Sequence, residues 1–283
     1  MLEDVMWLDS SGSSTDLHNG QDLFILEGSA GLDMPEFKFV TDDFPTSDGG
    51  EVRMVKAAGR DVHIHLLVKC SSRSLLREKI RSLSRVMNPK LGNGRLRVTS
   101  ADGKQRDLIC RYVRGLEDED TGFSWREVVL VFRAWKPFWQ SVSERLTTFV
   151  SGGAAPFFPI FPLVLSNSAV FSSRSLENQG DTECWPVWTV YGPGENLKVV
   201  NFTTSQELEV SITLNQEDTL EIDTRPGFKA VKMGDGSNQF YRLSPESVLW
   251  PLQRGENQVQ IELSNTNESS KVIVHYVERF LAA

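Results

Sequence analysis

Two histidines spaced by one residue are the first feature of this 283-residue sequence that suggests metal chemistry. His63 and His65 alternate with apolar residues in "RDVHIHLLVKC", so an extended strand would place both imidazoles on one face. A protein zinc site needs further ligands of the same kind. His18 and His275 are the only other histidines, and nothing in the sequence places either of them near the pair. We therefore expect no metal site.

Paired carboxylates are a second potential source of chemistry. Glu221 and Asp223 are one such pair, but a glycosidase needs two carboxyl groups that face one cleft. Acidic residues on edge strands commonly serve to prevent aggregation instead. The sequence also contains no GxSxG nucleophile turn, no phosphate-binding loop, no GxGxxG motif and no HExxH motif. We therefore expect neither an enzyme nor a cofactor.

Aromatic residues crowd the segment "CWPVWTVYGP", which suggests either a sugar-binding platform or a core strand. Trp185 and Trp188 are three residues apart, so a strand between Pro186 and Pro193 would direct them to opposite faces. A sugar platform would have aromatic side chains two residues apart, but the residue two positions after Trp188 is Val190. We therefore interpret the segment as core packing, with a carbohydrate-binding adhesion module as the alternative.

The cysteines and the N-terminal segment indicate the compartment. Cys70, Cys110 and Cys184 lie far apart and form no CxxC pair, which predicts buried free thiols rather than disulfides or a zinc site. The segment "MLEDVMWLDSSGSS" has acidic residues where a secretion signal would have basic ones. No apolar run approaches the roughly 20 residues that span a bilayer. We expect synthesis in a cytoplasm and no membrane partner.

Charge is unevenly distributed along the chain, which has a net charge of −8. Residues 1–68 contain 13 acidic and 4 basic side chains, whereas residues 69–114 contain 3 acidic and 13 basic ones. An acidic run follows directly, made of Glu117, Asp118, Glu119 and Asp120. Nucleic-acid binding needs a broader positive surface. The two segments either attract each other between copies of the chain or neutralise each other within one copy.

Most of the basic residues belong to a predicted helix in "SSRSLLREKIRSLSRVMNP". Ser72 or Ser74 can cap its start, and Asn88 before Pro89 ends it. One face has apolar residues at helical spacing, namely Leu76, Ile80, Leu83 and Met87. Another face has arginines, and these are the candidate interface between copies: Arg73, Arg77, Arg81 and Arg85.

The other predicted elements are strands. Asp102-Gly103 predicts a hairpin with a two-residue turn, and "FSWREVVLVFRAWKPFW" predicts a long strand. Small residues and prolines in residues 149–162 predict a linker between an N-terminal domain (1–148) and a C-terminal domain (163–283). Short, regularly spaced strands after this linker predict an antiparallel β-sandwich. We thus expect a mainly β chain, with a sandwich-like first domain that includes one helix and a hairpin.

Three C-terminal segments resemble the C-terminal domain of distal tail proteins of long-tailed, non-contractile bacteriophages. These segments are "GDTECWPVWTVYGPGENLKVVN", "LEIDTRPGFKAVK" and "SVLWPLQRGENQVQIE". The N-terminal half is similar to the same family in its order of features: Trp7, a strand, a helix that ends in "MNP", "GNGRLRV", "DGKQRDLICRYVRGLE" and "WKPFW". The resemblance covers almost the whole chain, except for a stretch from Ser11 to Gly50 that reads as loop.

The resemblance implies a structural protein at the distal end of a virion tail, made in the cytoplasm of a host bacterium. Family members form a hexameric ring that joins the tail tube to the tip or hub proteins of the baseplate. N-terminal domains would close the ring around a channel, and galectin-like C-terminal domains would project outward. DNA would pass through without specific binding, which makes Glu117, Asp118, Glu119 and Asp120 candidates for the channel lining.

Overall fold

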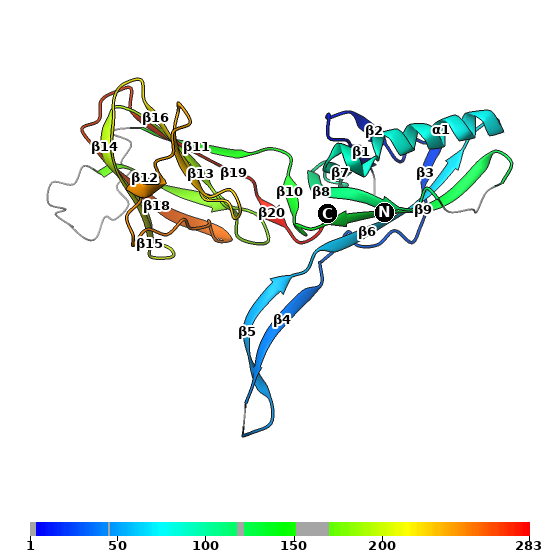
Figure 1. Ribbon diagram of the computed structural model, residues 1–283, viewed down its shortest axis with the longest axis horizontal. Coiled ribbons are helices and arrows are strands. Elements are labelled where there is room, and N and C mark those ends of the chain that lie inside the picture. Colours follow the sequence, from blue (N-terminus) through cyan, green and yellow to red (C-terminus); the bar gives the residue numbers. More distant parts are fainter. Residues whose placement is uncertain (1–3, 45, 118–121, 151–169) are drawn as a thin grey trace. The chain divides into compact units, whose positions relative to one another are not determined.

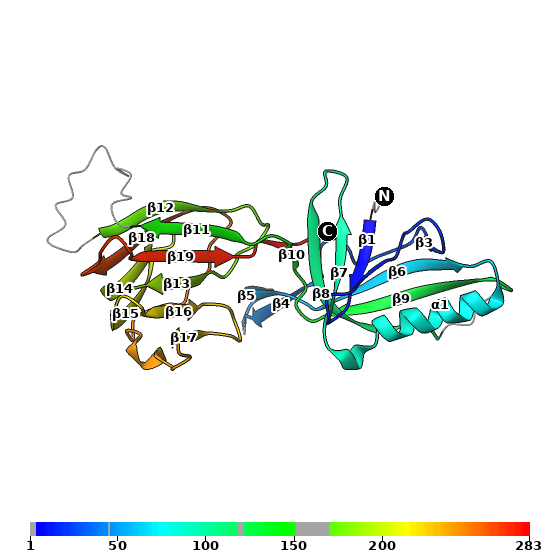
Figure 2. The same cartoon turned by 90° about the horizontal axis from the view of Figure 1, so that it is seen from above.

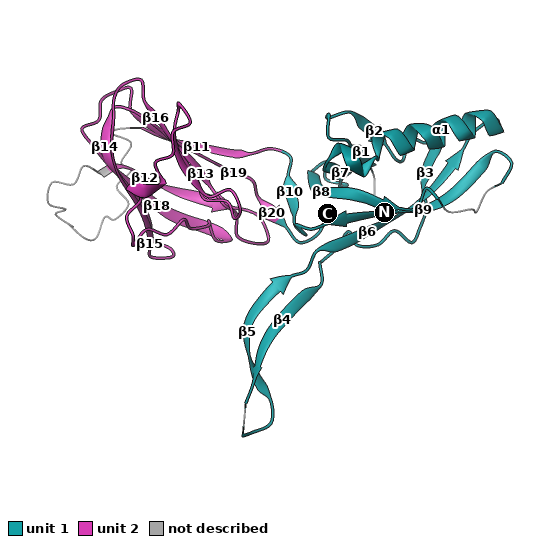
Figure 3. Ribbon diagram, in the orientation of Figure 1, with its two compact units in different colours: residues 1–142, 280–283 teal, residues 143–279 magenta. Residues whose placement is uncertain are grey.

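A computed structural model describes residues 4–44, 46–117, 122–150 and 170–283 of the chain. These residues divide into two compact units (Figure 3). The first comprises Met1–Val142 with Phe280–Ala283, and the second comprises Ser143–Arg279. Both units consist mainly of β-strands, and the described part of the chain has a single α-helix. The predicted mainly β fold class is therefore confirmed.

The first unit is built on an antiparallel sheet with the strand order β2-β1-β7-β8-β9-β6-β3, and β10 pairs with β8 and with β20. β8 joins two halves of this sheet, because its start pairs with β7 and its end pairs with β9. Trp7 of β1 thereby stacks on Phe132 of β9, with 4.9 Å between ring centroids. The bounds are β1 (Asp4–Leu8), β2 (Ser14–Asp16), β3 (Leu23–Ile25), β6 (Arg60–Lys69), β7 (Gly94–Thr99), β8 (Gln105–Arg114), β9 (Trp125–Ala134), β10 (Trp139–Ser141) and β20 (Arg279–Phe280).

Helix α1 (Arg73–Val86) lies against β6 and β9 of this sheet (Figure 2). It begins at Ser72, whose hydroxyl accepts a hydrogen bond from the Leu75 amide. The indole Nε1 of Trp7 donates to the Val86 carbonyl at 2.8 Å and so satisfies a backbone group at the helix end. The predicted apolar face is confirmed, because Leu76, Leu83 and Met87 are buried and Ile80 packs against the same core. A short 3₁₀ helix (Pro89–Leu91) follows.

The predicted hairpin between β7 and β8 is present, but its turn is one residue longer than expected. The Ser100 amide donates to the Lys104 carbonyl, which leaves a three-residue loop. Gly103 has φ of +77°, and a three-residue loop needs such a left-handed residue at its end. Gly94 in β7 is also required, because a Cβ there would lie 2.3 Å from the Trp7 ring.

A separate hairpin projects from the rest of the first unit (Figure 1). Its strands β4 (Phe37–Asp43) and β5 (Gly50–Ala57) pair only with each other. The expectation that residues 11–50 are loop was therefore wrong, since β2, β3 and β4 all lie there. The signal was weak because both faces of the hairpin are exposed, so no buried face imposes a polar and apolar alternation.

The second unit is the predicted antiparallel β-sandwich. One sheet has the order β11-β19-β13-β16-β17 and the other β12-β18-β14-β15. Side chains from both sheets form one hydrophobic core. The strands are β11 (Arg145–Val150), β12 (Val170–Asn178), β13 (Val187–Tyr191), β14 (Gly194–Asn201), β15 (Gln206–Leu214), β16 (Thr219–Asp223), β17 (Ala230–Met233), β18 (Gly255–Ser264) and β19 (Lys271–Tyr276), with a 3₁₀ helix at Phe240–Arg242.

The division between the units differs from the predicted linker at residues 149–162. Phe149 and Val150 belong to β11, where they pair with β19, and Phe149 is fully buried in the core of the second unit. Residues 151–162 lie outside the described residues. The chain instead crosses between units after Val142 and returns after Arg279. Composition alone was misleading, because the small residues and prolines follow a core strand of the second unit.

The last residues are held in the first unit by two arginines. Arg60 is 5% exposed and donates to the carbonyls of Asp33 at 2.5 Å and Leu281 at 2.7 Å. Arg106 donates to the Ala282 carbonyl at 2.7 Å and stacks over the Phe280 ring. Burial lowers the pKa of Arg60 to about 10, so its guanidinium is still charged at neutral pH.

Candidate functional site

The four predicted interface arginines form one exposed row along α1. Arg73, Arg77, Arg81 and Arg85 are all exposed, and none forms an ion pair with a described residue. They are spaced four residues apart, and like charges at that spacing destabilise a helix by about 0.2–0.5 kcal/mol per pair. The folded monomer therefore has a row of like charges in which no arginine forms an ion pair with a described residue.

This row borders a groove of about 380 Å³ between α1 and β9. Apolar side chains of Leu76 and Ile80 contribute to the groove beside the arginines. Arg126 of β9 is a further basic lining residue that the sequence did not reveal, because its position depends on how β9 passes α1. We name this feature the arginine groove, and its lining is Arg73, Leu76, Arg77, Ile80, Arg81, Gly122 and Arg126. Its chemistry suits a partner with carboxylates around an apolar side chain.

A second charged surface lies at the tip of the β4–β5 hairpin. Residues 42–51 contain four acidic and no basic side chains. Asp42 pairs with Arg53, whereas Asp43, Asp48 and Glu51 form no ion pair with any described residue. We name residues 42–51 the acidic tip. We did not predict this surface, although the excess of acidic residues in residues 1–68 and the turn-forming "SDGG" are signals that could have identified it.

The predicted channel-lining run is only partly described. Glu117 is exposed and accepts hydrogen bonds from the Gly115 amide at 2.9 Å and the Tyr112 hydroxyl at 3.0 Å. These bonds, led by the one from the Gly115 amide, lower the pKa of Glu117. The candidates Asp118, Glu119 and Asp120 lie outside the described residues. Glu117 thus has a local role in the turn after β8.

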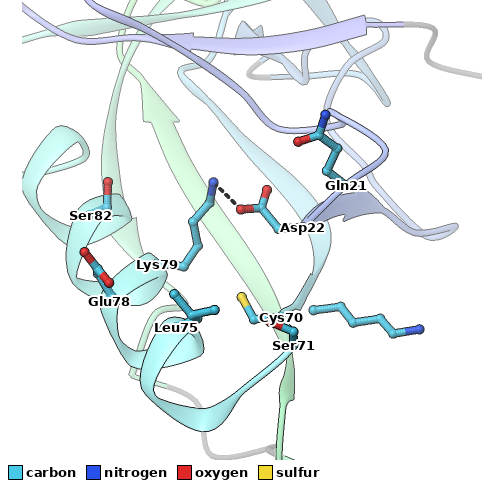
Figure 4. Close-up of a pocket in the computed structure, with 9 residues that line it drawn as sticks. Gln21, Asp22, Cys70, Ser71, Leu75, Glu78, Lys79 and Ser82 are labelled. Carbon is cyan, nitrogen blue, oxygen red and sulfur yellow. Dashed lines mark ion pairs between the residues drawn. The ribbon is translucent and has the colours of Figure 1, made fainter.

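A shallow pocket lies beside the start of α1, next to the end of β6 (Figure 4). An ion pair between Lys79 and Asp22 crosses it, with 2.7 Å between nitrogen and oxygen. Cys70 also lines this pocket, and burial raises the pKa of its thiol. A thiol with a raised pKa is a poor nucleophile at neutral pH. Cys70 is therefore not an activated nucleophile in this pocket.

All three cysteines are free thiols, as predicted. Cys110 and Cys184 are buried, and burial raises the pKa of each to about 12. Both side chains therefore behave as small apolar groups within the cores of their units.

The paired histidines and carboxylates serve local structure. His63 is bridged to Ala30 on a neighbouring segment, and the Nδ1 atom of His18 accepts a hydrogen bond from the Ile25 amide. Asp223 is buried and pairs with Arg225 at 2.6 Å. β16, which carries this aspartate, lies between β13 and β17, so the acids are not on an edge strand as we had assumed. The described residues include no group of three or more potential metal ligands.

The tryptophan segment forms part of the core of the second unit. Trp188 is fully buried and meets Trp250 edge to face, with ring centroids 5.7 Å apart. Trp185 is only half-buried, and the Lys229 amine lies over its ring. The two indoles therefore do not form a joint sugar-binding platform, and core packing is confirmed for Trp188.

A model of the family described as siphovirus-type tail component, C-terminal domain, matches residues 179–280. This match covers most of the β-sandwich. Residues 179–280 are therefore similar to the C-terminal domain of siphovirus-type tail components. A search of curated proteins found no matching sequence.

Solved structures share the fold of the whole chain. The crystal structure of SPP1 Dit (gp 19.1), described as a paradigm of the hub adsorption apparatus in phages that infect Gram-positive bacteria, has a TM-score of 0.70 at 15% identity. That alignment covers 98% of this chain and 99% of the other. A chain of the phage P2 baseplate in its activated conformation with Ca has a TM-score of 0.57 at 11% identity, with both chains fully covered. The same baseplate with Sr gives 0.56 at 9% identity and 99% coverage of both chains. Within the described residues, no helix has the length and apolar character needed to cross a membrane.

Proposed function

We propose that this chain forms a hexameric ring at the distal end of a phage tail and joins the tail tube to the hub or tip proteins. The observation that carries this proposal is the tail-component domain at residues 179–280. The likeness of the whole chain to proteins from a hub adsorption apparatus and a baseplate supports it. The role is structural and involves neither catalysis nor a cofactor.

In this proposal the first units close the ring and the second units, as galectin-like sandwiches, face away from the channel. The first unit has the surfaces that suit such a contact, because it bears both the arginine groove and the acidic tip. A closed ring of identical copies needs two different faces on each copy. Oppositely charged faces on one unit meet that requirement and disfavour contact between like faces.

DNA passes through the proposed channel without being held. An acidic lining repels phosphate, and the run from Glu117 to Asp120 is our candidate for that lining. Fluorescence anisotropy of the assembled ring with double-stranded DNA tests this part of the proposal. We expect no binding at physiological salt, and tight binding that weakens steeply with salt contradicts the acidic channel.

Native mass spectrometry of the purified chain over a range of concentrations tests the ring itself. The proposal predicts a species of six times the chain mass of 31.8 kDa. A chain that stays monomeric at every concentration, or one that forms open chains of indefinite length, contradicts a closed hexamer.

A further inference from the structure

We propose that the acidic tip of one copy docks in the arginine groove of the next copy. This inference deepens the proposed function and rests on it, because it needs at least two assembled copies. It assigns a partner to each of the two charged surfaces of the first unit. The contact is head-to-tail, so each copy gives one tip and receives one.

The arginine groove needs an anionic occupant. Its arginines on α1 form no ion pair with a described residue. Their mutual repulsion weakens the helix, and a bound anion would relieve that repulsion. Consecutive arginines in the row are about 6 Å apart along the helix axis. Paired β-strands are about 5 Å apart, so Asp42 and Glu51, which are partners across β4 and β5, match that spacing.

The acidic tip has the complementary arrangement of apolar and charged groups. Phe44 is 47% exposed and follows directly after Asp43. Asp48 lies four residues further along the turn. The groove offers the reverse pattern, since Leu76 and Ile80 lie among arginines. Phe44 can thus cover the apolar part of the groove while the carboxylates meet the guanidinium groups.

The hairpin is also incomplete on its own. A two-stranded ribbon without a covered face is only marginally stable in water. Apolar side chains on both of its faces are about half exposed or more, namely Phe39 (62%), Val40 (46%), Val52 (51%), Met54 (49%) and Val55 (50%). A neighbouring copy that receives the tip covers part of this surface.

The tip of a copy does not reach the groove of the same copy. The β4–β5 hairpin and α1 extend from different sides of the first unit, as both views show (Figures 1 and 2). The competing occupant within one copy is the acidic run Glu117 to Asp120, which precedes Gly122 of the groove in the sequence. An experiment must therefore separate contacts between copies from contacts within one copy.

Two charge-reversed variants make this separation. The groove variant has Arg77→Glu with Arg81→Glu, and the tip variant has Asp43→Lys with Asp48→Lys. In each variant alone, the two reversed side chains face side chains of the same sign on the other surface, so two attractions between tip and groove become repulsions. In an equal mixture, the unchanged tip of the groove variant meets the unchanged groove of the tip variant, and the two reversed pairs meet each other with opposite signs.

Native mass spectrometry at about 0.05 M salt, where screening is weak, measures assembly of both variants. We expect the concentration for half-assembly to rise about tenfold or more for each variant alone. We expect the mixture to assemble like the parent, with three copies of each variant in a hexamer. Matched controls with the same charge change elsewhere, Lys90→Glu with Arg114→Glu and Glu217→Lys with Glu268→Lys, should assemble like the parent.

The outcomes separate this inference from the proposed function. If the parent forms hexamers and both reversed variants assemble as readily, the tip-to-groove contact is wrong and the ring stands. If each variant fails alone and the mixture fails too, the reversed tip and the reversed groove do not complement each other, and the inference is again overturned. If the parent never assembles, both the ring and the contact are contradicted. Circular dichroism of each variant confirms that the monomers are folded.

Discussion

The two units of this chain differ in how many charged side chains and strands they present without a partner among the described residues. The second unit buries aromatic and aliphatic side chains from two facing sheets in one core, and its buried charges are paired, as Asp223 is with Arg225. The first unit also has a hydrophobic core, but it presents a row of arginines that form no ion pair with a described residue and a hairpin whose described strands pair only with each other. The repulsion within the arginine row and the exposed hairpin both lower the stability of the monomer, and a partner that covers them is the simplest explanation for their presence. This difference supports the proposal that the first unit makes the assembly contacts.

The largest expected effect tests the self-contained core of the second unit. Trp188→Ala removes the largest fully buried side chain of β13 and should lower the free energy of unfolding by about 3–5 kcal/mol. Urea unfolding of the full chain, followed by circular dichroism, measures this change. Tyr241→Ala, at a position that is 74% exposed in the same unit, serves as the control and should change stability by less than about 0.5 kcal/mol. A similar small change in both variants would mean that Trp188 is not a core residue.

The next effect concerns the arginine that holds the end of the chain in the first unit. Arg60→Met leaves the buried carbonyl of Leu32 and the partly buried carbonyls of Asp33 and Leu281 without their charged donor. We expect a loss of about 2–4 kcal/mol in the free energy of unfolding, because each orphaned buried group has a desolvation cost. Arg53→Met, whose side chain is largely exposed, is the matched control and should have little effect. Equal stability of the Arg60 and Arg53 variants would contradict the stabilising role of Arg60 at the end of the chain.

Alkaline pH should weaken both cores through their thiols. Cys110 and Cys184 have a pKa of about 12 in the folded chain, whereas cysteines of the unfolded chain ionise near about 8.5. Unfolding therefore releases protons between these values, and the free energy of unfolding falls as pH rises through this range. We expect a fall of about 1 kcal/mol per pH unit for each thiol. Cys184→Ala should show a shallower fall between pH 8.5 and pH 10.5, and a slope equal to that of the parent would contradict the burial of this thiol.

The smallest effect is the most diagnostic of the arginine row. Arg81→Glu replaces repulsion with attraction toward Arg77 and Arg85 and should raise monomer stability by about 0.5 kcal/mol. The same change should weaken assembly. Thermal unfolding at a protein concentration too low for assembly measures the monomer stability, and native mass spectrometry measures assembly. Lys90→Glu lies outside the row and should change neither. A variant that loses stability and assembly together would indicate an ordinary structural role for Arg81.

Features set by local sequence were predictable. The apolar spacing and the Ser72 cap define α1, and the arginine row follows from the same periodicity. Most strands of the sandwich alternate in burial along one face, so their pattern appears in the sequence. The spacing of Trp185 and Trp188 predicted that they face opposite sides of a strand, and Trp188 is the one that is fully buried.

Features set by distant contacts were not predictable. Arg60 binds the carbonyl of Leu281, which lies 221 residues further along the chain, and no local pattern reveals such a contact. The assignment of Phe149 to a core strand likewise depends on pairing with β19, so the proline-rich composition after it gave a wrong boundary. The β4–β5 hairpin was not predicted because neither of its faces is buried. Arg126 was not predicted as a groove residue because its position depends on the packing of β9 beside α1.

A cryo-electron microscopy reconstruction of the assembled ring tests the central claim most directly. The account predicts a closed hexamer in which first units contact one another, with Asp43 and Asp48 of each copy within ion-pair distance of Arg77 and Arg81 of the next. It also predicts that the second units contribute no contact needed for closure. A ring closed through the β-sandwiches, with the arginine groove open to solvent, would contradict the account.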